Sequence, residues 1–106
     1  MKRKSIWLSY DLSFKGDYEG LYAWLDNHQA MECGNCVAFL SYEFDRDLIE
    51  EIKADLLASI SLSKRDRIYA IWMNEDGKVK GSFLFGKRKA SVWAGYGEIT
   101  CGVQDG

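Results

Sequence analysis

The order in which strand and helix patterns alternate is the feature that most constrains the fold of this 106-residue chain. Residues 5–11 alternate between apolar and mixed side chains with a period of two, which predicts a strand with one buried face. Asp17 then occupies an N-cap position, and apolar side chains recur at helical spacing over residues 17–29. Residues 36–42 return to a strand pattern. The first part of the chain therefore predicts the order β-α-β.

The middle of the chain predicts a second helix followed by a long strand. Asp47 and Glu50 have the spacing of a capping box, in which Asp47 accepts from the helix N-terminus and Glu50 reaches back to the cap. The apolar stripe of this helix consists of Ile49, Ile52, Leu56 and Ile60, with Leu57 alongside. Residues 67–73 are β-branched and aromatic, typical of a central strand covered on both faces. We therefore expect Ile71 as well as Ile52 to lie in the core.

A hairpin and one short strand are predicted beyond residue 73. Asp76-Gly77 between two strand patterns signals a tight turn, because glycine adopts positive φ at little cost. Residues 79–85 are the returning strand, and residues 90–94 predict a last short strand. From about residue 97 onward we expect a loosely ordered tail.

The region that follows the first helix leaves two arrangements open. Residues 31–33 and 37–42 either form a tight strand pair around Gly34 and Asn35 or belong to one bent strand. The first arm offers too few residues for a convincing pair, so the sequence favours the single bent strand.

Together these patterns predict the α+β class. Within it they fit a ferredoxin-like βαββαβ-type sandwich, with one antiparallel sheet, two helices on one face and an extra C-terminal hairpin or strand. Residues 1–106 have the length of a single domain, and such a chain buries roughly 60–70% of its unfolded surface. No apolar stretch approaches the roughly 20 residues that span a bilayer, and no signal-peptide core follows the N-terminus. We therefore expect a soluble cytoplasmic protein.

Three stretches carry a resemblance to a known family. They are residues 7–12 (WLSYDL) on the opening strand, residues 17–25 (DYEGLYAWL) on the first helix and residues 64–69 (KRDRIY) at the start of a strand. In these stretches the chain resembles the small non-integrase subunit of CRISPR adaptation complexes and its non-CRISPR relatives, the SinR-like and virulence-associated protein D-like proteins. The similarity covers about residues 5–73, and residues 93–97 (WAGYG) resemble the aromatic-glycine ending of SinR-like proteins.

The resemblance implies a ferredoxin-like fold and a homodimer. It also implies that Asp11, which matches the family's aspartate at the end of strand one, is a metal ligand or catalytic residue for phosphodiester cleavage. Two departures weaken the transfer of activity: the hairpin at Asp76-Gly77 and its return strand exceed what the short relatives have, and many members of the family lack nuclease activity. The fold therefore transfers more safely than the chemistry.

Asp11 is the carboxylate for which the sequence suggests a reaction. Mg²⁺ is commonly held by one or two carboxylates, with waters and substrate phosphates completing its shell. A twofold axis would supply the second Asp11, and the metal would act as a Lewis acid on phosphate. The alternative is structural, because an aspartate after a strand often accepts backbone N–H groups and starts a turn.

Basic clusters are the candidate contacts to nucleic acid. The formal net charge of −2 gives no overall attraction to phosphate, so binding would depend on local groups. Three clusters occur: Lys2, Arg3 and Lys4; Lys64, Arg65 and Arg67; and Lys87, Arg88 and Lys89. They either converge on one face and contact phosphates or act as solvated strand ends and turns.

The cysteine and histidine residues give weaker signals. Cys33 and Cys36 have the spacing of a zinc knuckle or a redox pair. A structural zinc site needs four ligands, and only Cys101 and His28 remain, so two small residues at a turn are the simpler interpretation. His28 lies at the end of the first helix, where a surface histidine is a simpler interpretation than a catalytic base.

The aromatic side chains on the predicted strands and helices allow two interpretations. They would stack on bases in a sheet-face RNA-binding mode, or they would pack in the core. Periodicity places most of them on buried faces, with Trp93 and Tyr96 as the expected exposed exceptions. The set comprises Trp7, Tyr22, Trp24, Tyr69, Trp72, Phe83, Phe85 and Trp93.

The sequence therefore supports two functions. The first is that of a CRISPR-adaptation-subunit-like protein, either a Mg²⁺-dependent endonuclease acting on RNA or DNA or a nucleic-acid-binding homodimer, with Asp11 as metal ligand and catalytic residue. The second is that of a non-enzymatic dimerisation or regulatory module. Whether the basic residues of 2–4, 64–67 and 87–89 share a face with Asp11 in a dimer discriminates between them.

Overall fold

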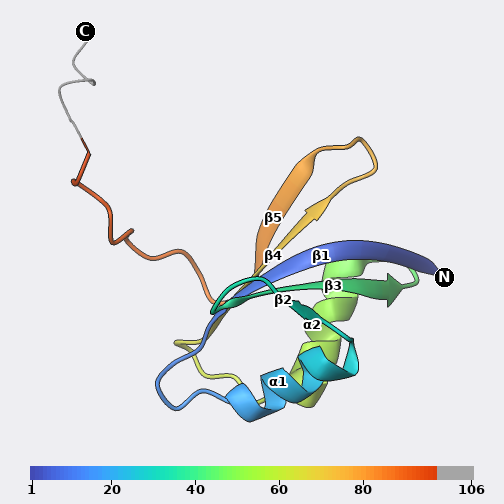
Figure 1. The fold of residues 1–106 in the computed structure, drawn as a ribbon, viewed down its shortest axis with the longest axis horizontal. Coiled ribbons are helices and arrows are strands. Elements are labelled where there is room, and N and C mark those ends of the chain that lie inside the picture. The colour runs from blue at the N-terminus through green and yellow to red at the C-terminus, as the bar shows by residue number, and fades with distance from the viewer. Residues whose placement is uncertain (98–106) are drawn as a thin grey trace, which may run out of the picture.

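The computed structural model describes residues 1–97 as a five-stranded sheet with two helices (Figure 1). The elements follow the order β1 (Lys2–Asp11), α1 (Tyr18–Asn27), β2 (Met31–Glu32), β3 (Val37–Phe44), α2 (Leu48–Ser59), β4 (Arg67–Met73) and β5 (Val79–Phe85). The sheet order is β2-β3-β1-β4-β5, and every neighbouring pair is antiparallel. The α+β class is thus confirmed. The tail expected from about residue 97 lies outside the described residues.

The core lies between one face of the sheet and both helices, which Figure 1 shows on the same side of the sheet. Period-two alternation points Ile6 and Leu8 of β1 into this core, where both are fully buried. Helix α2 contributes Ile52 and Leu56, also fully buried, as its stripe predicts, whereas Leu57, which was expected alongside them, is 59% exposed. No helix within residues 1–97 combines the length and hydropathy needed to cross a membrane.

Helix α1 begins at the predicted cap and buries Leu21, Trp24 and Leu25. The Asp17 carboxylate accepts the N–H of Gly20 at 2.9 Å and that of Ser61, after α2, at 2.9 Å. The hydrogen bonds from Ser61 and Gly20 lower the pKa of Asp17. Of the two aromatics for which periodicity suggested a buried face, Trp24 lies in the core, whereas Tyr22 is 52% exposed.

Helix α2 begins at Asp47, as predicted, but the residue that reaches back is different. Asp47 accepts the N–H of Glu50 at 3.2 Å. The expected return contact from Glu50 is absent from the hydrogen bonds of the described chain, and Glu50 instead lies 3.7 Å from Lys53. The Glu51 carboxylate takes that role, because it accepts the N–H groups of Asp45, Arg46 and Asp47 at 2.8–3.0 Å. The same three hydrogen bonds lower the pKa of Glu51.

The single bent strand favoured for the region after α1 is wrong. Met31 pairs with Phe39 and Glu32 with Ala38, so β2 and β3 form the tight pair. The pair closes around Gly34, whose φ of 140° is accessible to glycine and rare for other residues. Cys33 and Cys36 flank this turn as exposed free thiols.

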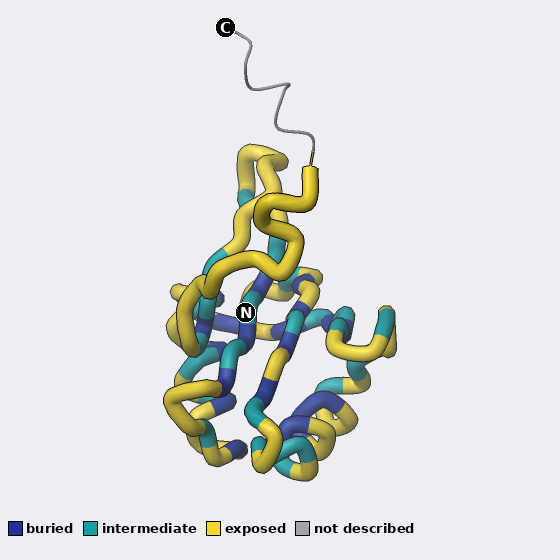
Figure 2. The backbone as a smooth tube through the Cα atoms, turned by 90° about the vertical axis from the view of Figure 1, so that its left-hand side faces the viewer, coloured by how far each residue is buried: buried dark blue, intermediate teal, exposed yellow. Residues whose placement is uncertain are grey.

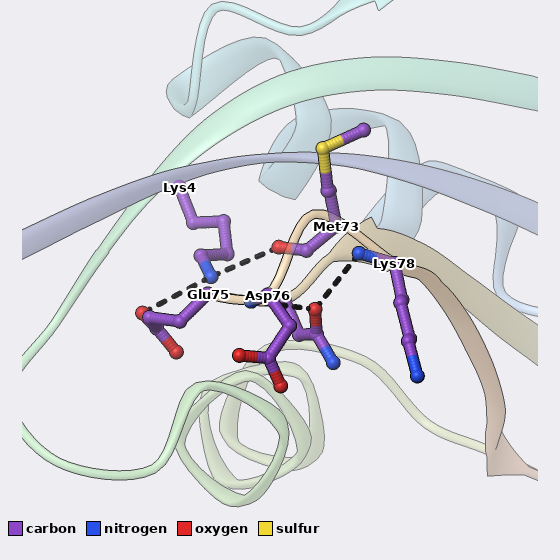
Figure 3. Close-up of polar contacts among 6 residues, drawn as sticks. Lys4, Met73, Glu75, Asp76 and Lys78 are labelled. Carbon is purple, nitrogen blue, oxygen red and sulfur yellow. Dashed lines mark hydrogen bonds and ion pairs between the residues drawn. The ribbon is translucent and has the colours of Figure 1, made fainter.

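Strands β4 and β5 are joined by a turn that one side chain organises (Figure 3). The Asn74 side-chain oxygen accepts the N–H of Asp76 at 3.0 Å and that of Lys78 at 2.9 Å. Gly77 sits between them with φ of 79°, the conformation for which the turn needs glycine. Figure 1 shows the resulting hairpin rising away from the helices.

The short strand predicted over residues 90–94 is wrong. The backbone curls there instead, since Ala94 N–H donates to Ser91 at 3.1 Å and Tyr96 N–H donates to Trp93 at 3.0 Å. Figure 2 shows the backbone after β5 as exposed. Trp93 and Tyr96 are 72% and 87% exposed, as the sequence predicted.

Strand β4 is covered on one face only, which corrects the expectation of two covered faces. Ile68 and Ala70 point toward the helices and are fully buried. Tyr69 and Ile71 point to the other side and are partly exposed, because both helices lie on the first side. Ile71 is therefore not part of the buried core.

Candidate functional site

The side of the sheet opposite the helices, which we call the open face, gathers aromatic and charged side chains. Strand register places Trp7 beside both Phe39 and Ile71, and Ser9 beside Tyr69. Trp7 is 41% exposed, so this aromatic belongs to the surface and not to the core. The open face comprises Trp7, Ser9 and Asp11 of β1; Val37 and Phe39 of β3; Arg67, Tyr69 and Ile71 of β4; and Gly81 and Phe83 of β5.

Asp11 lies at one end of the open face, paired with Arg67. The two residues are ladder partners between β1 and β4, and Arg67 Nη2 donates to Asp11 Oδ2 at 2.7 Å. The Asp11 side chain is 58% exposed and that of Arg67 is 26% exposed. The carboxylate is thus compensated by a cation and still reachable from solvent.

Two adjoining cavities open around this pair. One of about 390 Å³ lies on the open face and is lined by Ser9, Asp11, Arg67, Tyr69, Ile71, Phe83 and Arg88. The other, of about 460 Å³, extends from Asp11 and Arg67 along residues 88–93. Both volumes fall in the range of roughly 300–1,000 Å³ that is typical of ligand sites. Aromatic walls, two arginines and one carboxylate therefore meet in the same space.

Arg88 brings a second cation to these cavities. Its guanidinium lies 5.7 Å from the centre of the Phe83 ring, a cation–π contact that favours a position over the open face. No carboxylate within residues 1–97 forms an ion pair with Arg88. The positive charge of Arg88 therefore remains available to an anion.

Gly86 is the residue that brings Arg88 back toward the start of β4. Its φ is 82°, and a Cβ there would lie 2.7 Å from the carbonyl oxygen of Asp66 and 2.7 Å from Arg67 Cγ. Both the positive φ and the close approach exclude an ordinary side chain. The sequence analysis did not single out Gly86, although a glycine after a strand pattern is a known sign of close backbone approach.

Asp66 is a second positioning residue that the sequence analysis missed. It is buried, and its carboxylate accepts the N–H of Ser13 at 2.6 Å and that of Ser63 at 2.8 Å. Burial alone would raise the pKa of Asp66, but the hydrogen bonds from Ser13 and Ser63 outweigh it and lower the pKa. Asp66 thereby ties the loop after Asp11 to the turn before Arg67. In the sequence Asp66 lies between Arg65 and Arg67, so the stretch was interpreted as a basic cluster and its one carboxylate was not considered.

The three basic clusters do not gather as whole units. Arg67, Arg88 and Lys89 line the cavities next to Asp11. Lys64, Arg65 and Lys87 line neither cavity and are exposed.

Strand alternation splits Lys2, Arg3 and Lys4 between the two faces of the sheet. Arg3 lies on the same side as the open face and pairs with Glu43 at 2.6 Å. Lys4 points to the helix side, where its Nζ donates to the carbonyl of Met73 at 2.9 Å and lies 3.5 Å from Glu75 (Figure 3). Lys2 lies 5.9 Å from the centre of the Phe44 ring. These three residues therefore form their contacts at the start of β1, whereas Asp11 lies at its end.

The metal-ligand role expected for Asp11 would depend on this one carboxylate. Among the described residues, no three histidine, cysteine, aspartate or glutamate side chains cluster so as to hold a metal ion. Asp11 would offer one carboxylate, and Mg²⁺ would need waters, a substrate phosphate or the second Asp11 of a dimer for the rest of its shell.

A separate polar cleft of about 360 Å³ lies at the other edge of the sheet. His28 Nδ1 is 2.9 Å from the carbonyl oxygen of Trp24, and its Nε2 is 3.6 Å from Asp55. The Tyr42 hydroxyl donates to the same Asp55 oxygen at 2.9 Å. Burial and the hydrogen bond to Asp55 raise the pKa of Tyr42. His28 thus joins the end of α1 to α2, as a helix-terminal histidine and not as part of the open face.

Comparisons of the chain with protein-family models, with curated proteins and with solved structures found no match.

Proposed function

We propose that this protein binds nucleic acid through the open face and the basic groups next to Asp11. The observation that carries the proposal is that Arg88, a cation without a carboxylate partner in residues 1–97, lies over an aromatic ring at the rim of a cavity. Lys89 lines the adjoining cavity. Cations beside aromatic rings are the combination that contacts phosphates and bases together.

Charge distribution supports a local binding site. The chain carries a net charge of −2, so the protein as a whole does not attract the negatively charged backbone of nucleic acid. At the site, however, Arg67 compensates Asp11, and Arg88 and Lys89 remain as excess positive charge. A phosphate at this end of the open face would therefore be attracted.

The proposal includes a ferredoxin-like fold extended by β5 and a homodimer, as the family resemblance implies. The element order β-α-β-β-α-β that precedes β5 supports the fold assignment. Strand β5 has no partner on its outer side in the described sheet, and an unpaired edge favours pairing with a second copy. Sedimentation at micromolar concentration should give a dimer; a 12.1 kDa monomer at every concentration would remove this part of the proposal.

Fluorescence anisotropy with labelled oligonucleotides about 12 nucleotides long tests binding. The double variant Arg88→Ala, Lys89→Ala should weaken binding about tenfold or more, and the salt dependence of log K should fall by about 0.7 for each phosphate that is no longer neutralised. The charge-matched double variant Arg46→Ala, Lys53→Ala changes α2 and its cap region, away from the open face, and should bind like the wild type. No binding at low salt would instead favour a non-enzymatic dimerisation or regulatory module.

A second candidate function is metal-dependent cleavage with Asp11 as ligand. It is favoured by one observation: the Asp11 carboxylate is 58% exposed and lines both cavities. Pairing through β5 would set the two β1 strands five spacings of roughly 4.8 Å apart, so each Asp11 would hold Mg²⁺ by itself, with waters and a substrate phosphate completing the shell. The metal would then activate a water for attack on phosphate. Cleavage of RNA or DNA should then require Mg²⁺ or Mn²⁺, and Asp11→Asn should abolish cleavage while binding remains. Cleavage that persists in Asp11→Asn would exclude this role.

A further inference from the structure

Two pairs of aromatic rings lie in neighbouring rows of the open face. Trp7 and Phe39 have ring centres 4.9 Å apart, and Tyr69 and Phe83 have ring centres 4.8 Å apart. In the β1–β4 ladder, Trp7 faces Ile71, the next open-face residue of β4 after Tyr69. The two pairs therefore form a continuous apolar band across four strands.

Small residues on this face leave space beside the rings. Ser9 faces Tyr69 in the β1–β4 ladder and, with Phe83 and Ile71, lines the 390 Å³ cavity. On β5, a Cβ at Gly81 would lie only 2.4 Å from the Tyr69 hydroxyl oxygen, so the Tyr69 ring occupies the space above that glycine. Glycine at this position lets the ring lie across β5, with its side against Phe83.

The charges at the rim indicate which ligand is complementary to this band. Arg88 and Lys89 lie at its Asp11 end, and neither has an ion-pair partner within residues 1–97. A nucleic-acid strand would bring phosphates to these cations, whereas the same face of a second copy would bring further cations. An apolar band bordered by cations therefore suits stacked bases with an anionic backbone better than a second open face.

We propose that the open face binds single-stranded nucleic acid, with unpaired bases stacked on Tyr69, Phe83 and Trp7 and a backbone phosphate on Arg88. This inference rests on the proposed nucleic-acid binding and adds the substrate class. In a duplex the faces of the bases are stacked on one another, so they are not free to stack on the aromatic rings of the protein. Stacking accepts every base, because each has a π-face, and we expect little sequence preference.

The experiment compares four probes of equal length: a single strand, its duplex, a strand with abasic residues in place of the central bases, and a random-sequence strand. Anisotropy is measured for the wild type, for Tyr69→Ala with Phe83→Ala, and for Tyr22→Ala, an exposed aromatic of α1 that serves as control. The wild type should bind both normal strands about 5- to 100-fold tighter than the abasic strand and the duplex. The double variant should lose that preference, and Tyr22→Ala should keep it.

The abasic probe keeps the inference testable even if the double variant unfolds, because it removes the bases without changing the protein. Equal binding of the normal strand, the abasic strand and the duplex would overturn stacking. If Arg88→Ala with Lys89→Ala still weakened all three in that case, phosphate binding at this face would stand alone. If the wild-type protein bound none of the four probes, the proposed function itself would be excluded.

Discussion

Arg67 Nη2 donates to Asp11 Oδ2 at 2.7 Å across the ladder position where β1 ends and β4 begins. The Arg67 Nε atom is buried and has no hydrogen-bond partner among residues 1–97, so within this part of the chain the contact with Asp11 orients the guanidinium. Both residues of the pair line the two cavities at this end of the open face.

Asp11→Asn should tighten nucleic-acid binding in the presence of a chelator, by up to about fivefold, because it removes a negative charge next to the proposed phosphate contact at Arg88. The unfolding free energy should change by less than about 1 kcal/mol, since the Asp11 side chain is 58% exposed and asparagine keeps an oxygen that can accept from Arg67. Anisotropy and thermal denaturation measure the two effects. Glu43→Gln, which breaks the comparable pair with Arg3 at the opposite sheet end, should leave binding unchanged. Weaker binding by Asp11→Asn would show that the carboxylate itself contacts the ligand.

Asp66→Asn should destabilise the protein by about 1–3 kcal/mol at neutral pH, because a buried carboxylate with two backbone N–H donors is replaced by an amide that can satisfy them only in part. Denaturant unfolding measures the loss. Asp76→Asn, in the exposed β4–β5 turn, is the matched control and should cost little. A loss as small as that of Asp76→Asn would mean that Asp66 does not hold the two loops together.

Acid should reduce this difference between wild type and Asp66→Asn. The folded-state pKa of Asp66 is lowered from an ordinary value of 3.8, so its stabilising contribution is complete well above that pH. The contribution is lost as the pH falls through 3.8 toward the lowered pKa. Unfolding free energies measured from neutral pH down to about pH 3 should therefore converge for the two proteins. A gap that widened on acidification would contradict the sign of the shift.

Gly86→Ala should cost about 1–3 kcal/mol, since alanine is strained at a φ of 82° and its Cβ would approach a backbone oxygen to 2.7 Å. It should also weaken nucleic-acid binding, because the segment that carries Arg88 must move. Gly97→Ala, where a Cβ meets nothing within 4 Å, is the control for both measurements. Unchanged binding by a folded Gly86→Ala would show that the path of the chain after β5 does not position Arg88.

Local patterns predicted the elements well where one side of an element is buried. Period-two alternation placed Ile6 and Leu8 inward, and the caps Asp17 and Asp47 marked both helix starts. These signals depend on neighbours in sequence, which is why a single chain reveals them. The two-residue strand at Met31 escaped because so short an element carries no period of its own.

The site was predicted in part, through Asp11 and the basic clusters, but its assembly was not. The predicted first strand covered only residues 5–11, so its alternation was not extended to Arg3 and Lys4, which lie on opposite faces of β1. Which cluster comes near Asp11 depends on strand pairing, which the sequence alone does not give. Aromatic strand residues read as core because hydrophobicity does not reveal that both helices lie on one side. The exposure of Trp7 on the surface therefore follows only from the three-dimensional arrangement of sheet and helices.

The comparison of Ile52→Ala with Ile71→Ala tests whether the open face is uncovered. Ile52 is fully buried between helix and sheet, and its truncation should cost about 2–5 kcal/mol through lost burial and a cavity. Ile71 is partly exposed on the open face, so Ile71→Ala should lower the unfolding free energy by less than about 1.5 kcal/mol. Leu57 is exposed, and Leu57→Ala is the control that should change the unfolding free energy little. Denaturant unfolding should be repeated over a wide range of protein concentrations. An Ile71→Ala loss that equals that of Ile52→Ala and grows with concentration would mean that a second copy covers the open face, since coupling to dimerisation makes stability depend on concentration.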